Sequence, residues 1–275
     1  MNTATERDTP AASTPAASGQ PLVSLRAISK TFSNGTLALQ DMSLDVGRGE
    51  FVSLLGPSGC GKSTALRIIA GLGEPTSGTV EWPLSEADAA GTGRPEIGFV
   101  FQEPTLMPWA TVAHNVWLPL RLKGVSQRAA NDRVMDALGM VGLAAFAGSY
   151  PRELSGGMKM RVSIARALIT RPHVLLMDEP FAALDALTRR KMQDELLQLW
   201  DDTHFTVLFV THSIPEAIKI GNRILLLSPH PGQVKAEINS VPRGEHDAAR
   251  HQELEDKINA MLFSDRIEEE GQHHG

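Results

Sequence analysis

One stretch of the sequence combines glycines, a lysine and hydroxyl side chains in the spacing of a phosphate-binding loop. Its residues are Gly56, Pro57, Ser58, Gly59, Cys60, Gly61, Lys62 and Ser63, followed by Thr64. Glycines let the backbone adopt conformations that other residues avoid, so that several N–H groups can converge on phosphate oxygens. In such a loop Lys62 reaches the β- and γ-phosphates, the Ser63 hydroxyl coordinates Mg²⁺, and Thr64 can add a hydroxyl contact. The spacing therefore predicts a site for ATP and Mg²⁺.

Four further polar residues could complete a site for hydrolysis. Asp178 and Glu179 come directly after the apolar run at residues 174–177, where an open α/β sheet places its ligands. We expect Asp178 to hold Mg²⁺ through water and Glu179 to polarise or deprotonate the attacking water. His212, which follows another apolar run, is placed to hydrogen-bond the γ-phosphate. Gln102 is placed to sense both the metal and the water.

Each of these residues has a simpler interpretation when it is taken alone. The glycine-rich loop could be a turn that contains Lys-Ser by chance. A carboxylate pair after a strand is often a helix N-cap with a solvated neighbour, a single histidine there is usually structural, and a single glutamine is usually a surface amide. The ordered combination of all of them favours the functional interpretation.

The predicted site needs a buried strand that ends where the glycine-rich loop begins. A short, nearly continuous apolar run at residues 51–55 precedes the loop. A helical pattern follows it at residues 64–70 and is ended by Gly71, Gly73 and Pro75. Strand, tight turn and helix are the context that a phosphate-binding loop requires.

Other apolar patterns predict the rest of the fold. Further buried parallel strands are expected at residues 174–177 and 206–210, and alternating antiparallel strands at residues 22–27 and 39–46. Helical spacing without a strand signal begins at about residue 104. The predicted class is α/β: a P-loop NTPase (RecA-like) core with an antiparallel β subdomain and an inserted α-helical subdomain.

These patterns divide the chain into three parts. Residues 1–20 are rich in Ala, Thr, Ser and Pro, lack the apolar middle of a secretory signal, and are expected to be a disordered tail. Residues 21–235 are expected to form the ATPase domain, with the helical subdomain at about 104–160. Residues 236–275 are expected to be a C-terminal extension with a peripheral helix, because apolar residues recur there at helical spacing: Leu254, Ile258, Met261 and Leu262.

The composition argues against several classes of function. The chain has 275 residues, 42% hydrophobic content and a net charge of −6 with scattered basic residues, so no nucleic-acid partner is expected. Its single cysteine, Cys60, cannot form an internal disulfide, which fits a reducing compartment such as the cytoplasm. No apolar run approaches the roughly 20 residues that cross a bilayer, so membrane attachment is expected to go through a partner.

A second glycine-containing motif indicates a family. Residues 154–168 resemble the signature sequence of ABC ATPases, whose contacts with ATP would come here from Ser155, Gly156 and Gly157. Phe32 stands where the family places an aromatic residue that stacks on adenine. Asp185 stands where the family places a residue at a dimer interface. With the elements above in the expected order, the resemblance covers roughly residues 22–234.

The resemblance implies a head-to-tail homodimer in which ATP lies between the phosphate-binding loop of one subunit and the signature of the other. The Ser155 hydroxyl, two glycine N–H groups and the dipole of the following helix would form this second anion site. In isolation, such a tetrapeptide is more often a helix N-cap followed by turn glycines. Met158 replaces the commoner Gln and Phe32 the commoner Tyr. We expect activity to survive both changes, with looser selectivity for the base.

Longer stretches resemble one branch of this family. Residues 101–109, 177–185, 192–196 and 225–232 are similar to ATPase subunits of importers for nitrate, sulfonate, taurine and related small anions. The resemblance implies a transmembrane permease subunit as partner and, indirectly, a periplasmic solute-binding protein. It also implies a peripheral location on the cytoplasmic face of the inner membrane.

An apolar cluster on the flank of Gln102 suggests where the permease would bind: Leu106, Met107, Trp109 and Trp117. By resemblance this flank forms a groove that receives a short cytoplasmic helix of the permease. An ordinary subdomain core is the alternative, and it is stronger for Trp117 than for Trp109. The alternative function is a soluble, non-transport ABC ATPase, although the tandem domains or long coiled-coil insertions typical of that class are not apparent in the sequence.

Overall fold

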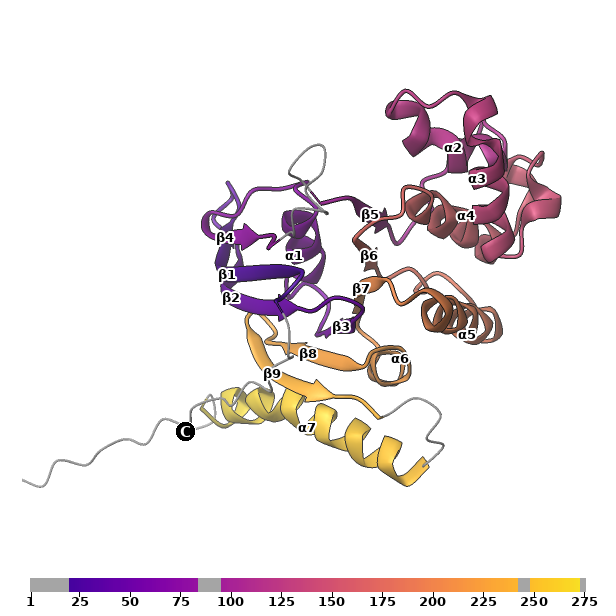
Figure 1. Ribbon diagram of the computed structural model, residues 1–275. Helices are drawn as coiled ribbons and strands as arrows, with labels where there is room; N and C mark the ends of the chain where they lie inside the picture. Colours follow the sequence, from indigo (N-terminus) through magenta and orange to yellow (C-terminus); the bar gives the residue numbers. More distant parts are fainter. Residues whose placement is uncertain (1–19, 84–94, 242–247, 273–275) are drawn as a thin grey trace, which may run out of the picture.

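The computed structural model describes residues 20–83, 95–241 and 248–272. Its larger sheet has six strands in the order β5-β6-β7-β3-β8-β9 (Figure 1). Neighbouring strands pair in parallel except β8 and β9, which are antiparallel. The α/β class predicted from the sequence is confirmed. The strands are β5 (Ile97–Val100), β6 (Val174–Asp178), β7 (Thr206–Thr211), β3 (Phe51–Leu55), β8 (Arg223–Leu227) and β9 (Val234–Asn239).

The central strands β3, β6 and β7 are buried along their whole length, as their continuous apolar sequences predict. Leu54, Leu176 and Leu208 belong to the core shared with α1, whereas Met177 and Phe209 belong to the core shared with α4 and α5. Alternate residues of each strand therefore face opposite helical layers. The described helices are α1 (Lys62–Ile69), α2 (Val112–Leu122), α3 (Gln127–Met140), α4 (Gly156–Leu168), α5 (Ala186–Thr203), α6 (Ile214–Ile220) and α7 (Ala248–Gln272).

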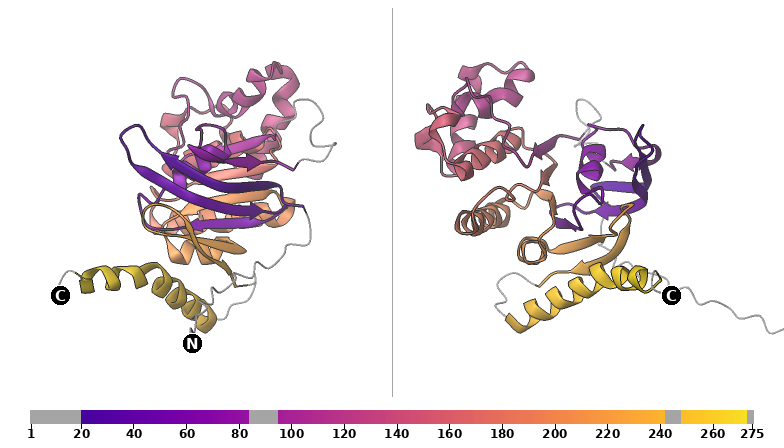
Figure 2. Two further views of the ribbon diagram at one scale, coloured as in Figure 1. Left: turned by 90° about the vertical axis from the view of Figure 1, so that its left-hand side faces the viewer. Right: turned by 180° about the vertical axis from the view of Figure 1, so that it is seen from behind.

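A second, antiparallel sheet lies beside α1, with the order β2-β1-β4 (Figure 2). Its strands are β2 (Leu37–Val46), β1 (Val23–Thr31) and β4 (Ser77–Glu81). Buried residues of β1 and β2 pack with those of α1 in one core. The sequence predicts strands in the regions of β1 and β2, but it predicts no strand at β4. β4 carries one apolar side chain, Val80, so its sequence has no alternation, and its pairing with β1 defines it as a strand.

The helical subdomain contains α2, α3 and two short 3-10 turns, and α4 adjoins it (Figure 1). Thr111, Ser126 and Ser155 cap α2, α3 and α4 by accepting hydrogen bonds from backbone N–H groups. α4 runs past residue 160, where the subdomain was expected to end. Val162 packs in the core of the subdomain and Ile164 in the core of the main sheet, so α4 belongs to both.

The C-terminal part of the described chain packs against β8 and β9. Ile258 and Leu262 of α7 are buried in one cluster with Ile218 of α6, and Leu254 and Met261 pack against that cluster. The expected domain boundary at residue 235 falls inside β9, which continues to Asn239. Residues 1–19 of the predicted tail lie outside the described residues. Within the described ranges, no helix combines the length and the apolar character that a membrane span requires.

Candidate functional site

The P-loop, defined as residues 56–63, joins the end of β3 to the start of α1. Gly61 caps α1 with a φ of 97°, in the left-handed region that favours glycine. A Cβ at Gly61 would also lie 2.6 Å from the carbonyl oxygen of Ala38, so β2 approaches the loop too closely for any other residue. α1 begins at Lys62, two residues earlier than expected, so the free N–H groups of its first turn belong to the loop. This arrangement binds anions.

The Lys62 ammonium is buried beneath the P-loop. Its Nζ donates hydrogen bonds to the carbonyl oxygens of Gly56, at 2.7 Å, and Pro57, at 2.8 Å. The same nitrogen lies 3.9 Å from Oε1 of Glu179. The positive charge of Lys62 therefore lies between the P-loop and the end of β6. Gly56 and Pro57 take part through their carbonyl groups.

Ser63 and Asp178 form a pair of oxygen ligands suited to a magnesium ion. Ser63 Oγ donates a hydrogen bond of 2.8 Å to Oδ1 of Asp178. Burial raises the pKa of the Asp178 carboxyl, and the hydrogen bond from Ser63 opposes this effect. The described residues contain no group of three or more His, Cys, Asp or Glu side chains placed to hold a metal ion. A few protein oxygens, completed by phosphates and water, are how Mg²⁺ is usually held at nucleotide sites.

Glu179 lies at the end of β6 and points to the end of β7. Its Oε2 lies 2.9 Å from Nδ1 of His212. The backbone of Glu179 has a φ of 45°, which is unusual for a residue with a side chain, and its N–H donates to the carbonyl of Val210. The two residues come from neighbouring parallel strands, so the pairing of β6 with β7 brings them together. A carboxylate held between a lysine and a histidine is well placed to act as a general base.

Nine of the predicted site residues line one open hollow of about 450 Å³ above the P-loop. Phe32 at one side is 44% exposed and has the Lys30 ammonium 5.6 Å from its ring centroid. Predicted site residues in the lining are Phe32, Ser58, Gly59, Gly61, Lys62, Ser63, Thr64, Gln102 and Glu179. The hollow therefore joins an aromatic platform to the phosphate loop and the carboxylate.

Five residues predicted for the nucleotide and hydrolysis sites lie outside this lining: Gly56, Pro57, Cys60, Asp178 and His212. Cys60 is fully buried, burial raises the pKa of its thiol, and its Sγ lies 3.9 Å from Lys62 Nζ. Its side chain is therefore not available to a ligand in the hollow. In the described structure, His212 does not line the hollow and is linked to the site through its contact with Glu179.

His230 also lines the hollow, although it belongs to none of the motifs that predict the nucleotide site. It lies in the turn between β8 and β9. Ser228 Oγ donates to the Pro231 carbonyl at 2.6 Å, and the N–H of Gly232 donates to the Ala38 carbonyl at 3.0 Å. The first bond lies within the turn, and the second holds the turn against β2. The pairing of β8 with β3 places this turn beside the P-loop, and no local sequence signal reveals that pairing.

The signature residues lie at the start of α4, outside the lining of this hollow. Ser155 Oγ accepts a hydrogen bond of 3.3 Å from the N–H of Met158. A Cβ at Gly157 would lie 2.8 Å from the Thr188 methyl group of α5, so the glycine allows close packing of the two helices. Gly156 is exposed. The N-terminal N–H groups and the dipole of α4 are features of an anion site.

Asp185 caps α5 next to the signature. Its Oδ1 accepts hydrogen bonds from the N–H groups of Leu187, at 3.1 Å, and Thr188, at 3.0 Å. The bond from Thr188 is the main reason why the pKa of Asp185 is lowered from its usual value. Because Thr188 also contacts Gly157, Asp185 and the signature are structurally linked.

Comparison with known proteins agrees with this geometry. Residues 39–182 match the family model described as ABC transporter. The taurine import ATP-binding protein of Rhizobium johnstonii is 45% identical, over 82% of this chain and 89% of its own. The nitrate import ATP-binding protein of Synechocystis sp. is 42% identical, over 84% of this chain and 86% of its own.

A solved structure is also similar. It is the dimeric, post-hydrolysis state of an ATP-binding cassette bound to ADP and phosphate. The identity is 38% and the TM-score 0.68, over 80% of this chain and 99% of that one. The family match, the relatives and the site agree: the chain belongs to the ABC transporter family, as an ATP-binding subunit that hydrolyses ATP.

Proposed function

We propose that ATP binds in the hollow with its base on Phe32 and its phosphates in the P-loop. The carrying observation is that Lys62, Ser63 and Glu179 converge there from two strand ends, with Ser63 bonded to Asp178. Lys62 would exchange carbonyl partners for phosphate oxygens, which form stronger, charge-assisted hydrogen bonds. Backbone N–H groups of the P-loop and the first turn of α1 would bind the remaining phosphate oxygens.

The same proposal assigns a role to each residue of the hydrolytic site. Mg²⁺ would be held by Ser63, Asp178 and Gln102, and it would supply charge neutralisation for the phosphates. Glu179 accepts a proton from the attacking water. His212 holds the Glu179 carboxylate through the 2.9 Å contact. We assign it a hydrogen bond to the γ-phosphate as well, because it follows β7 directly beside Glu179.

Removal of magnesium tests the oxygen pair formed by Ser63 and Asp178. We expect excess EDTA to lower the rate of phosphate release at least about 100-fold, because charge neutralisation by a bound metal contributes several kcal/mol. Added MgCl₂ should restore the rate. A rate that is insensitive to EDTA would contradict the metal site.

We further propose that two copies close head to tail, with Ser155, Gly156 and Gly157 of one copy binding the phosphates held by the other. The exposed N-terminal end of α4 supports this assignment, because the signature residues lie outside the hollow of their own chain. Their N–H groups could therefore bind a phosphate held by a second copy. The related cassette bound to ADP and phosphate is described as dimeric. Asp185, beside the signature, would lie at the same interface.

The transport role that we propose is uptake of a small anion such as nitrate, taurine or another aliphatic sulfonate. Taurine and nitrate are the solutes named for two relatives. A transmembrane permease would carry the solute, a periplasmic solute-binding protein would deliver it, and this subunit would lie on the cytoplasmic face of the inner membrane. ATP-driven closure of the dimer would move the permease by differential binding.

The docking site for the permease would be a hollow of about 280 Å³ in the helical subdomain. Trp109 lies at its rim and is 78% exposed, which is unusual for a large apolar side chain. Trp117 is partly buried against the subdomain core, and its Nε1 donates to the Val125 carbonyl at 3.1 Å. Trp109 is therefore the side chain available to a partner, while Trp117 supports the wall.

Replacing Trp109 with alanine is expected to uncouple transport from hydrolysis. An interface tryptophan commonly contributes about 2 kcal/mol or more, so permease binding should weaken roughly thirtyfold and uptake should fall with it. ATP hydrolysis by the isolated subunit should stay unchanged. Uptake in cells that carry the cognate permease, co-purification and phosphate release are the measurements.

Leu72→Ala is the matched control, because Leu72 is also an exposed apolar residue but lies just after α1. It should leave uptake and hydrolysis unchanged. Normal permease binding and normal uptake by the Trp109 variant would defeat the docking site. Failure of any membrane protein to co-purify with the wild-type subunit would instead count against the transport role.

A further inference from the structure

Arg166, near the C-terminal end of α4, holds the chain segment that follows Gln102. Its Nη1 donates to the Thr105 carbonyl at 2.9 Å. Its Nη2 donates to the Pro104 carbonyl at 2.8 Å and to Thr105 Oγ1 at 3.0 Å. One guanidinium therefore binds three oxygens of two consecutive residues that are 61 and 62 positions away in the sequence.

These three bonds are all the hydrogen bonds that the Arg166 guanidinium makes within the described part of the chain. The guanidinium is partly buried, and burial lowers its pKa from the ordinary value. A partly buried charge needs polar partners, and here the segment 104–105 supplies them. The planar fork of arginine suits several acceptors at once, whereas a lysine ammonium acts as a point donor.

The segment that Arg166 holds is strained. Thr105 has a φ of 46°, in the left-handed region that a β-branched residue rarely adopts. Such a conformation persists where surrounding contacts over-determine it. Both oxygens of Thr105 accept hydrogen bonds from Arg166, so these bonds help to hold this conformation. Gln102, three residues earlier, lies in the lining of the ATP hollow.

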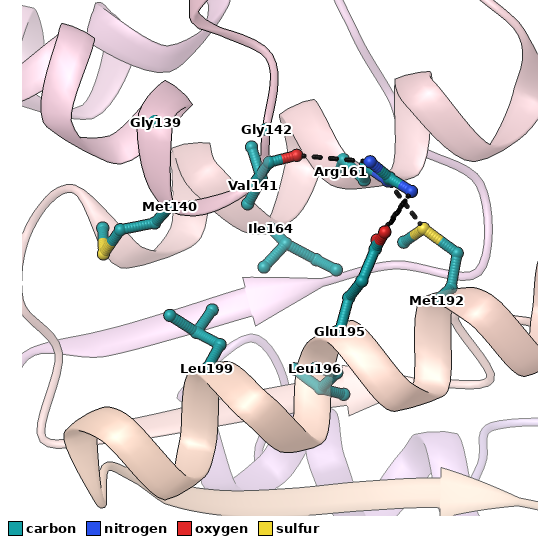
Figure 3. A pocket seen from close by; sticks show the side chains of 10 residues that line it. All are labelled: Gly139, Met140, Val141, Gly142, Arg161, Ile164, Met192, Glu195, Leu196 and Leu199. Atoms are coloured by element: carbon teal, nitrogen blue, oxygen red, sulfur yellow. Dashed lines mark hydrogen bonds and ion pairs between the residues drawn. The ribbon is translucent and has the colours of Figure 1, made fainter.

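A second arginine on α4 makes contacts of a different kind. Arg161 Nη2 donates to Glu195 Oε1 at 2.7 Å, and its Nε lies 3.1 Å from the Met192 sulfur, so α4 is tied to α5 (Figure 3). Its Nη1 also reaches the Val141 carbonyl at 3.5 Å, just after α3. Figure 3 shows Arg161 between these partners at the edge of a hollow of about 280 Å³. Arg161 thus fixes α4 to neighbouring helices without touching the Gln102 segment.

We propose that Arg166 is a positioning residue that sets the place of Gln102 in the hydrolytic site and ties it to the signature end of α4. The inference rests on the role assigned to Gln102 above. Arg166 and Ser155 lie on one helix, about 16 Å apart at 1.5 Å per residue. A shift of the Gln102 segment would therefore act on the helix that carries the signature, and a shift of that helix would act on Gln102.

The first test measures the mobility of the segment without any nucleotide. A nitroxide spin label is attached at pH 7 to the variant Glu103→Cys, since position 103 is exposed and the buried Cys60 thiol has a raised pKa. We expect Arg166→Ala and Arg166→Lys to increase the mobility of the label. Arg161→Ala is the matched control and should leave the mobility unchanged.

The second test measures ATP hydrolysis by the unlabelled variants. For Arg166→Ala and Arg166→Lys we expect kcat to fall about tenfold with KM for ATP changed less than twofold, because general positioning of a catalytic group affects turnover more than binding. Added guanidinium should restore part of kcat in Arg166→Ala and have no such effect on the wild-type protein. Rescue of this kind would not follow from loss of stability alone.

The outcomes separate the inference from the function on which it rests. Unchanged label mobility in Arg166→Ala, or an equal increase in Arg161→Ala, would contradict the inference that the bonds from Arg166 hold this segment in place. Increased mobility with an unchanged kcat would overturn the positioning role of Arg166 without contradicting the role assigned to Gln102. Increased mobility together with lower kcat and rescue by guanidinium would support the proposal.

Discussion

Replacing Glu179 with glutamine is expected to lower kcat for ATP by about 1,000-fold while ATP still binds. Removing a general base typically costs 100-fold to 10,000-fold in rate. An amide keeps the size of the side chain and can still hydrogen-bond His212, so the geometry at the strand ends should survive. Loss of the negative charge 3.9 Å from Lys62 favours bound phosphates, so the affinity for ATP should hold or increase.

The measurements are single-turnover phosphate release and the size of the protein with and without ATP. We expect the variant to accumulate an ATP-bound dimer, because ATP closes the dimer but is not hydrolysed to reopen it. Glu103→Gln, an exposed carboxylate next to Gln102, is the control and should keep wild-type turnover. Repeated rapid turnovers by the Glu179 variant would show that another group is the base.

The strand ends that form the site could be predicted because their signals are local. β3, β6 and β7 have continuous apolar sequences, and parallel strands covered by helices on both faces require such sequences. Polar residues that follow such strands must gather at one edge of the sheet. For this reason the sequence alone predicts that the P-loop and Glu179 meet at one edge of the sheet. The caps of α4 and α5 at Ser155 and Asp185 are also local features.

Other parts of the site depend on pairing between distant segments, which no local pattern reveals. His230 reaches the hollow only because β8 pairs with β3. The strand β4 exists through its pairing with β1, although Val80 is its single apolar residue. Arg166 binds a segment about 60 positions away, and the sequence shows only an arginine in an amphipathic helix.

Helix α4 carries both a motif that the sequence predicts and contacts with distant segments that it does not predict. Its first turn carries the signature, Arg161 fixes it to α5, and Arg166 fixes it to the segment after Gln102. Because α4 packs in the cores of both the helical subdomain and the main sheet, it cannot move without changing one of these contacts. The helix is therefore the element through which docking at Trp109 would reach the ATP site.

Replacing Lys62 with alanine is expected to weaken ATP binding about 100-fold and to reduce kcat/KM by a larger factor. A hydrogen bond to a charged partner commonly contributes about 1.5–3 kcal/mol, and Lys62 is placed to bond two phosphates. Lys62 also holds the Gly56 and Pro57 carbonyls, so part of the effect will come from a less ordered loop. Equilibrium binding of a fluorescent ATP analogue and steady-state hydrolysis measure the two effects.

Loss of the loop must be distinguished from loss of the phosphate contact. Lys62→Arg keeps the positive charge, but its longer, forked head does not fit the buried position behind Gly56 and should also bind ATP weakly. Lys219→Ala removes a surface lysine whose partner is Asp194, and it should bind ATP like the wild type. Melting temperatures identify variants that remain folded. A folded Lys62→Ala protein that binds ATP at wild-type affinity would contradict the P-loop as the phosphate site, because no other described lysine lines that hollow.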